Sequence, residues 1–157
     1  MKICEYSTTL SSSFKTLNEE WLKKYFVVEP YDTVLLENCE SEIINKGGHI
    51  FFGILDNKVI ATYALLPPID GCVELGKMAV TEKSQGKGYG QQLLKHVFAT
   101  TRLLGYKEIL LYSNRILENS IYLYKKFGFK EVQNIDSPYK RGNICLLYTS
   151  DAADDSD

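Results

Sequence analysis

The chain has 157 residues, of which 45% are hydrophobic and 24% charged, and its formal net charge is −2. These values are typical of one globular domain, and the sequence offers no membrane-spanning stretch, no secretory signal and no basic cluster for nucleic acid, so we expect a cytoplasmic protein. Its four cysteines and two histidines are scattered, so we expect free thiols and no metal site.

The first part of the chain predicts a strand, two helices and a β-hairpin. Apolar and aromatic residues recur at helical spacing from Phe14 to Phe26, which predicts a helix with one apolar face. Residues 29–32 break this helix, and Gly47-Gly48 stops the next one. Asp56-Asn57 is typical of a two-residue hairpin turn. In chain order we expect a strand at 2–6, helices at 14–26 and 33–45, and strands at 50–55 and 58–66.

The second part predicts two more helices between strands. Gly105 and Gly128 end these helices. His96 falls outside the apolar face of the first one, so we expect it to be exposed to solvent. The run at 108–113 is almost continuously apolar, which predicts a strand buried on both faces. In chain order we expect a strand at 73–80, a helix at 91–104, a strand at 108–113, a helix at 119–127, a strand at 129–132 and a last strand that begins at Ile144.

A glycine-rich segment, Gln85-Gly86-Lys87-Gly88-Tyr89-Gly90, joins the strand at 73–80 to the next helix. Glycines at a helix start let backbone N–H groups point at one place, and the helix N-terminus adds partial positive charge. Lys83 and Lys87 add full charges, so the expected ligand is a phosphate or pyrophosphate. The segment lacks the glycine spacing of a P-loop or of a dinucleotide-binding fold. It fits the pattern Gln/Arg-x-x-Gly-x-Gly.

That pattern resembles the acetyl-CoA loop of the GCN5-related N-acetyltransferases, the GNAT superfamily. Residues 74–80 and 109–114 are similar to the family's fourth and fifth strands, and residues 120–129 resemble its closing signature. The resemblance extends from Met1 to Ile144 and is that of a small, bacterial-type member with one domain. It implies the GNAT fold, an α/β (α+β) architecture with a central mixed, mostly antiparallel sheet, splayed fourth and fifth strands and about four flanking helices.

The resemblance also implies an activity. Acetyl-CoA is the co-substrate, no metal is needed, and the acetyl group passes directly to a primary amine of a small molecule, a protein N-terminus or a lysine. A monomer or homodimer is expected, with no nucleic acid and no membrane as partner. The reaction requires that the amine lose a proton, that the thioester carbonyl be polarised and that the leaving thiolate be protonated.

Tyr124 and Glu74 are the candidate acid and base. In the family, the tyrosine at the place of Tyr124 lies near the thioester sulfur, and a phenol can protonate a thiolate; the alternative is a core tyrosine. Glu74 matches the base of the histone-acetylating branch, and partial burial would raise its pKa toward neutrality; the alternative is a carboxylate exposed at the strand edge. We expect Glu74 in strand register with Gly76, Met78 and Val80.

The other site residues follow from the same resemblance. The cofactor-binding residues that it implies are Met78, Ala79, Val80, Gln85, Gly86, Lys87, Gly88, Tyr89, Gly90 and Asn114. The amide of Asn114 either bonds to the pantetheine arm or forms a strand-ending turn. In the family the acceptor pocket is shaped by the loop between the first two helices, which points to Tyr25, Phe26 and Tyr31. Trp21 is expected in the core.

Residues 145–157 are expected to be a non-native tail, which leaves residues 1–144 as the acetyltransferase domain. The segment from Cys145 to Asp154 looks like a translated sequencing-library adapter; the alternative is a native acidic tail. The apolar residues 145–149 could still fill the edge position of a lost native strand, whereas the small and acidic residues 151–157 cannot bury apolar surface.

Two other functions remain open from the sequence. The chain could be a CoA-binding sensor or regulatory module that keeps the fold without turnover, although it retains both Tyr124 and Glu74. It could also be a nucleotide-binding protein unrelated to CoA, in which case the closing signature at residues 120–129 would be a coincidence.

Overall fold

The computed structural model describes residues 1–133 and 136–150, and over these residues seven strands form one sheet of order β1-β2-β3-β4-β5-β7-β6. Every neighbouring pair is antiparallel except β4 and β5. The strands are β1 (Lys2–Glu5), β2 (His49–Leu55), β3 (Lys58–Leu65), β4 (Cys72–Val80), β5 (Glu108–Ser113), β6 (Lys130–Val132) and β7 (Ile144–Thr149). The five α-helices of the described residues are α1 (Ser11–Tyr25), α2 (Pro30–Glu37), α3 (Cys39–Glu42), α4 (Tyr89–Leu104) and α5 (Glu118–Lys126). The predicted mixed, mostly antiparallel sheet is confirmed.

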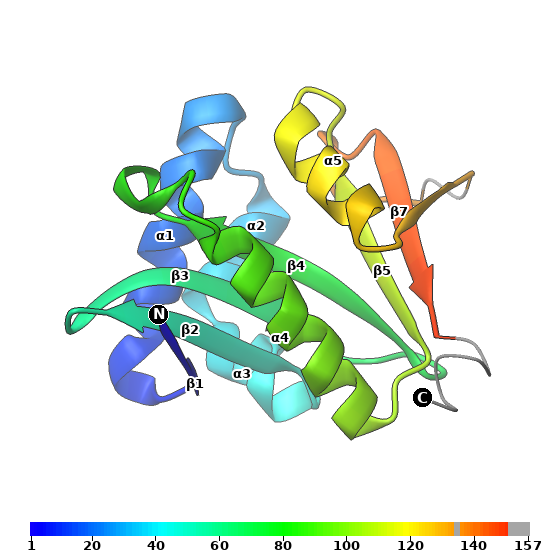
Figure 1. Cartoon of the computed structure of the whole chain (residues 1–157). Helices are drawn as coiled ribbons and strands as arrows, with labels where there is room; N and C mark the ends of the chain where they lie inside the picture. Colours follow the sequence, from blue (N-terminus) through cyan, green and yellow to red (C-terminus); the bar gives the residue numbers. More distant parts are fainter. Residues whose placement is uncertain (134–135, 151–157) are drawn as a thin grey trace.

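Helices cover both faces of this sheet (Figure 1). α4 and α5 lie on one face, and α1, α2 and α3 lie on the other. The core under α4 and α5 includes Tyr63, Leu65, Val73, Leu75, Leu93, Leu94, Val97, Ile109 and Leu146. The core under α1, α2 and α3 includes Phe14, Leu22, Leu35, Leu36, Ile43, Ile50 and Phe52. No helix in the described part of the chain is long and apolar enough to cross a membrane.

The second helix differs from the prediction of one helix over residues 33–45. α2 begins already at Pro30, and a separate one-turn helix, α3, follows it. A proline suits the first helical position because that residue needs no N–H, and Asp32 accepts a hydrogen bond from the backbone N–H of Glu29 at 2.9 Å in a capping box. The segment expected to break the chain therefore starts a helix and holds Asp32 inside the fold.

The predicted burial of His96 and that of β5 are both wrong. His96, expected in solvent, packs against Phe51 with 4.9 Å between ring centroids, and its Nδ1 lies 2.8 Å from the Tyr63 hydroxyl. Burial lowers the pKa of His96, which favours the neutral imidazole. β5, expected to be buried on both faces, alternates instead: Ile109 and Leu111 are buried, and the residues between them are only partly covered.

A β-bulge interrupts β4. Ala79 pairs with Thr62 of β3. Gly76 pairs with Ala64, so β4 has one residue more than β3 between these two pairs. Lys77 lies at this point with a φ of 51°, in the left-handed region that a lysine rarely adopts.

The bulge corrects the register predicted for Glu74. Side chains alternate between the two faces of a regular strand, so without the bulge Glu74 would share a face with Met78 and Val80. The extra residue instead turns Met78 and Val80 toward the core under α4, where Val73 also lies. Glu74 keeps the face of Gly76, on the α1 side of the sheet, and the predicted register with Met78 and Val80 is wrong.

β4 and β5 are paired over a short stretch only. Their parallel register covers three pairs, from Cys72 with Glu108 to Glu74 with Leu110. Beyond these pairs the two strands diverge, as Figure 1 shows, and the predicted splay of the fourth and fifth strands is confirmed. Backbone N–H and C=O groups on the inner edges of the two strands are left for another partner.

β7 is an interior strand. It lies between β5 and β6 and pairs with both, and Ile144, Cys145 and Leu146 are buried. The prediction that residues 145–149 fill an edge position is therefore wrong. That residues 145–149 are non-native stays a prediction. The rest of the expected tail, residues 151–157, lies outside the described residues.

We expect removal of residues 145–157 to lower the melting temperature strongly, because it takes a buried strand from between two others. Removal of residues 151–157 alone should leave the melting temperature unchanged, because these residues are small or acidic. Thermal unfolding followed by circular dichroism compares the two deletions. A clear loss of stability on removal of the last seven residues alone would argue for a native tail.

Candidate active site

A cavity of about 700 Å³ occupies the gap between the diverging ends of β4 and β5. β4, the glycine-rich segment and the start of α4 form one side, and the end of β5 with α5 forms the other. The end of α1 and three residues of the segment before β7 complete the wall. All the site residues predicted from the sequence line this cavity except Lys87 and Tyr31. In the described part of the chain, no group of three or more His, Cys, Asp or Glu side chains could hold a metal ion.

The glycine-rich segment brings a helix N-terminus to the cavity. Gly86 and Gly88 have φ values of 77° and 84°, which residues with a Cβ atom rarely adopt, and Gly88 is the N-cap of α4. Gln85 Nε2 donates a hydrogen bond to the Val80 carbonyl at 2.9 Å, which ties the segment to the end of β4. The first N–H groups of α4 have no partner within the helix and carry partial positive charge. This end of the cavity suits an anion.

We expect Gly88→Val to weaken CoA binding far more than Lys87→Ala. A valine is strained at a φ of 84°, and its side chain would stand between the backbone amides and an anion. Lys87 is exposed and does not line the cavity, so its loss should cost about 1 kcal/mol or less. Calorimetric titration with CoA measures both.

A matched control separates backbone strain from ligand binding. Gly105 ends α4 with a φ of 81° and does not line the cavity, so Gly105→Val should cost stability but leave CoA affinity intact. A greater loss of affinity in Lys87→Ala than in Gly88→Val would contradict an anion site built from backbone amides.

Tyr124 lines the cavity from α5, with its hydroxyl 3.9 Å from Met78 Sδ of β4. Its ring packs edge-on against Phe129, with 5.8 Å between centroids. Burial raises the pKa of Tyr124 to about 12, so the phenol remains protonated at neutral pH. The side chain is packed like a core residue and still presents a proton donor at the cavity.

Glu74 lines the cavity close to the bulge at Lys77. Burial raises the pKa of the Glu74 carboxyl to about 7, and the positive charge of Lys77 opposes part of this rise. The predicted shift toward neutrality is confirmed. A carboxyl with this pKa exists in both protonation states near neutral pH, which suits a general base. Since β5 pairs with β4 no further than Glu74, the edge of β4 beyond this point is free, and all the residues from Glu74 to Val80 line the cavity.

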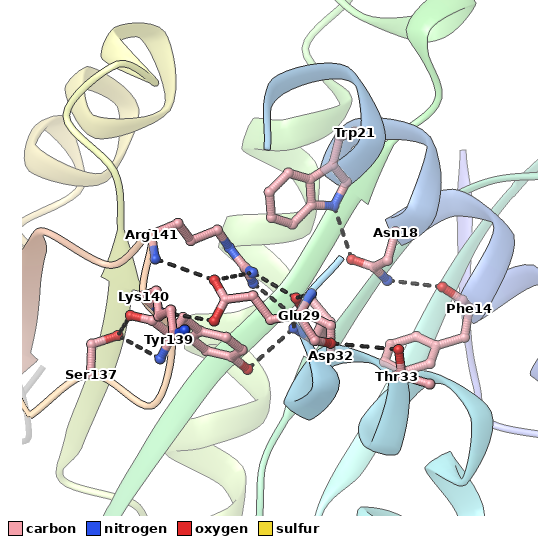
Figure 2. Close-up of polar contacts among 11 residues, drawn as sticks. Phe14, Asn18, Trp21, Glu29, Asp32, Thr33, Ser137, Tyr139, Lys140 and Arg141 are labelled. Carbon is pink, nitrogen blue, oxygen red and sulfur yellow. Dashed lines mark hydrogen bonds and ion pairs between the residues drawn. The ribbon is translucent and has the colours of Figure 1, made fainter. Parts of the chain in front are cut away.

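A largely buried ion-pair network, which no sequence pattern predicted as a whole, surrounds Asp32 (Figure 2). It includes Lys77, whose charge acts on the carboxyl of Glu74. Both oxygens of Asp32 accept hydrogen bonds from Arg141, at 2.6 and 2.7 Å, and Oδ1 also accepts one from Lys77 Nζ at 2.5 Å. Arg141 also donates to Glu29 at 3.3 Å, and Lys77 donates to the Tyr139 hydroxyl at 3.2 Å. Burial acts to raise the pKa of Asp32, but the hydrogen bonds from Arg141 and the charge of Lys77 hold that pKa below its usual value. Asp32 is therefore ionised and pairs with both cations.

Part of this network has a signal in the sequence. Glu29-Pro30-Tyr31-Asp32 has the acid, proline and acid of a capped helix start, and Lys77 is, with Glu74, one of two charges inside an otherwise apolar strand. Arg141 comes from an irregular segment 109 residues after Asp32, and no local pattern links the two.

Aromatic side chains at the end of α1 form another part of the wall. Tyr25 and Phe26 line the cavity. Trp21, expected in the core, is only half-buried and lines it as well. Tyr31 does not line it and packs instead against Tyr139, with 5.4 Å between ring centroids. A role in acceptor binding stays a prediction for Tyr25 and Phe26, whereas Tyr31 contacts the cavity-lining ring of Tyr139.

Asn114, which follows β5, uses its side-chain amide within the protein. Nδ2 donates to the Arg141 carbonyl at 2.7 Å, and Oδ1 accepts from the Ile116 N–H at 3.0 Å. These bonds form a strand-ending turn. Each end of the amide retains capacity for one more hydrogen bond, so contact with a pantetheine arm stays a prediction.

Comparisons with known proteins agree with one another. The family model described as "Acetyltransferase (GNAT) family" matches residues 14–129. YvbK of Bacillus subtilis strain 168, named an uncharacterized N-acetyltransferase, is 28% identical over 114 residues, which is 71% of this chain and 73% of that protein. An acetyltransferase of the GNAT family from Staphylococcus aureus Mu50 has a TM-score of 0.85 at 22% identity, covering 94% of this chain and 98% of that chain. A GNAT family acetyltransferase from Elizabethkingia anophelis with acetyl-CoA bound has a TM-score of 0.65 at 23% identity, covering 95% and 97%.

Proposed function

Because the chain belongs to the acetyltransferase (GNAT) family, we propose that it is an N-acetyltransferase that moves the acetyl group of acetyl-CoA directly to a primary amine. One observation carries the proposal: the helix N-terminus at Gly88, the phenol of Tyr124 and the carboxyl of Glu74 border a single cavity. In that order they suit a pyrophosphate, a leaving thiolate and an amine. The Elizabethkingia anophelis protein, which has this fold, binds acetyl-CoA, and this supports acetyl-CoA as the co-substrate here.

The proposed reaction proceeds without a covalent enzyme intermediate. Glu74 removes a proton from the ammonium, through water, and the free amine attacks the thioester carbonyl. As the C–N bond forms and the C–S bond breaks, Tyr124 donates its proton to the departing thiolate, and the proton that the nitrogen loses on becoming an amide restores the phenol.

We assign the cofactor to the β4 and α4 side of the cavity and the acceptor to the α1 side. Backbone groups on the free edge of β4 bind the pantetheine arm, and the glycine-rich segment binds the pyrophosphate. The proposed cofactor residues are Met78, Ala79, Val80, Gln85, Gly86, Gly88, Tyr89, Gly90 and Asn114. The proposed acceptor residues are Tyr25 and Phe26, with Trp21 added because it lines the cavity.

The decisive test is release of free CoA thiol from acetyl-CoA in the presence of a panel of amines, with the acetylated product identified by mass spectrometry. Amine-dependent release supports the proposal. Tight CoA binding with no turnover on any amine would favour a CoA-binding sensor, and equal competition by ATP would favour a nucleotide-binding protein.

We expect kcat/KM to rise as pH increases through about 7, because Glu74 accepts a proton only once it is ionised. Glu74→Gln should lower kcat/KM about 100-fold and remove this limb of the profile. Comparison of the two profiles with the same amine cancels the ionisation of the substrate. An unchanged limb in Glu74→Gln would contradict the role of base.

The same pKa shift predicts a change in stability. The pKa of Glu74 is raised on folding from 4.5 to about 7, so its contribution to stability is fully present below pH 4.5 and is lost as pH rises through 7. The free energy of unfolding of Glu74→Gln minus that of the wild type should therefore be more positive at pH 8 than at pH 4. Urea unfolding at the two values measures the difference.

A further inference from the structure

Aromatic side chains wall the acceptor end of the cavity. Trp21 and Phe26 lie edge to face with 6.3 Å between ring centroids, and Tyr25 packs beside Phe26 at 6.5 Å. Tyr25 is 44% exposed, and Trp21 and Phe26 are half-buried. Large apolar side chains left open to solvent around a cavity suit the apolar part of a ligand.

The cations next to these rings are already neutralised. The guanidinium of Arg141 lies 5.7 Å from the centre of the Trp21 ring. Asp32 accepts two hydrogen bonds from it, and Glu29 accepts a third. The ammonium of Lys77 is bonded to the same Asp32. The ammonium of Lys24 lies 5.2 Å from the centre of the Tyr25 ring and forms an ion pair with Glu82 at 2.6 Å. Three cations therefore face three carboxylates.

The charge that remains at this end is the carboxyl of Glu74. Within residues 1–133 and 136–150, the third basic residue that lines the cavity is Lys126, which lies in the last turn of α5. α5 lies on the opposite face of the sheet from α1, which carries the aromatic wall (Figure 1). Residues 134–135 and 151–157 contain no Lys or Arg. A carboxylate or phosphate on the acceptor would thus lie among rings and near Glu74 without a cation to pair with, and an unpaired anion is costly to desolvate.

We propose, on the basis of the acetyl transfer proposed above, that the acceptor is a small amine whose remaining part is aromatic or apolar and carries no carboxylate or phosphate. The ring of such an amine packs against Trp21 and Phe26, and its ammonium is attracted to Glu74 and to the aromatic faces. Anionic amines are excluded because Lys77 and Arg141 are already paired with Asp32 and Glu29 and cannot serve as counter-ions for the acceptor.

Three matched acceptors test the charge. 2-Phenylethylamine, L-phenylalaninamide and L-phenylalanine carry a hydrogen, a neutral amide and a carboxylate at the same carbon. We expect kcat/KM, corrected for the unprotonated fraction of each amine, to be lower for L-phenylalanine than for L-phenylalaninamide by about tenfold or more. n-Butylamine, which lacks the ring, should fall below 2-phenylethylamine by about tenfold or more. A kcat/KM for L-phenylalanine as high as that for L-phenylalaninamide would overturn the proposal. So would a kcat/KM for n-butylamine or spermidine as high as that for 2-phenylethylamine.

A pair of variants tests the same point from the protein side. Tyr25→Arg places an unpaired cation at the edge of the wall, whereas Tyr25→Gln removes the same ring without adding charge. The kcat/KM of L-phenylalanine relative to L-phenylalaninamide should be about tenfold higher in Tyr25→Arg than in Tyr25→Gln. The same ratio in both variants would mean that a missing cation is not what excludes the carboxylate.

Calorimetric titration of the same amines into the protein saturated with CoA separates this inference from the proposed function. If no amine is acetylated but 2-phenylethylamine binds more tightly than L-phenylalanine, the acetyl transfer is wrong and the preference of the site stands. If amines are acetylated but L-phenylalanine is preferred, only the acceptor class is wrong. Absence of binding by every amine would overturn both.

Discussion

Tyr124→Phe is expected to lower kcat about 10–1000-fold while the KM for acetyl-CoA changes little. The phenol proton is needed as the thiolate leaves, so its loss raises the energy of the transition state rather than weakening the binding of acetyl-CoA. Burial raises the pKa of Tyr124 to about 12, which keeps the proton on the phenol across the working range of pH. Steady-state kinetics of thiol release measures kcat and KM separately.

The control for this variant is the same change at a tyrosine outside the cavity. Tyr106 follows α4 and does not line the cavity between β4 and β5, so Tyr106→Phe should retain wild-type kcat. A wild-type kcat in Tyr124→Phe, with the chemical step shown to be rate-limiting, would leave Tyr124 with a packing role against Phe129 only.

Asp32→Asn should reduce the free energy of unfolding by about 3–5 kcal/mol, the range for removing one partner of a buried ion pair. Asp32 is 0% exposed and bonds to both the buried Lys77 and the largely buried Arg141, so the substitution leaves these two cations without their shared counter-charge. The pKa of Asp32 is lowered on folding, so its contribution is present above its ordinary value of 3.8 and is lost as pH falls below it. The decrease in the free energy of unfolding caused by Asp32→Asn should therefore be large at pH 7.

Urea unfolding followed by circular dichroism measures this change, and the fluorescence of Trp21 reports on the same region because it is the single tryptophan of the chain. Glu37→Gln is the matched control, since Glu37 ends the same helix and forms an exposed ion pair with Lys15 at 3.1 Å. Exposed pairs contribute little, so this control should leave the unfolding midpoint almost unchanged. Equal midpoints for the two variants would mean that the network around Asp32 is not a stabilising unit.

The network also ties together the two sides of the cavity. Arg141 belongs to the segment before β7, and Asp32 and Glu29 belong to the start of α2, on the other side of β4 (Figure 2). Their bonds fix the position of Tyr139 and of the aromatic wall relative to Glu74. Loss of Asp32 is thus expected to affect the acceptor end of the cavity more than the glycine-rich segment.

Local patterns were sufficient for most of the fold and for the conformation of the glycine-rich segment. Asp56 and Asn57 adopt φ values of 50° and 63° in the predicted hairpin, and Gly105 and Gly128 end their helices with positive φ as predicted. The glycine-rich segment lies at the helix start where its spacing put it. These features depend on a few neighbouring residues, because backbone preferences and hydrophobic periodicity act over short distances in the chain.

The surroundings of Glu74 were decided by tertiary structure. The bulge at Lys77 separates Glu74 from Met78 and Val80, and Asp32 meets Arg141 across 109 residues. A lysine tolerates a left-handed backbone and full burial here only because a carboxylate from another helix meets its ammonium, and nothing near Lys77 in the chain encodes that partner. The sequence by itself thus determined the order of the main elements and the helix start at the glycine-rich segment, while long-range packing and charge pairing decided the face on which Glu74 lies and the partners of Lys77.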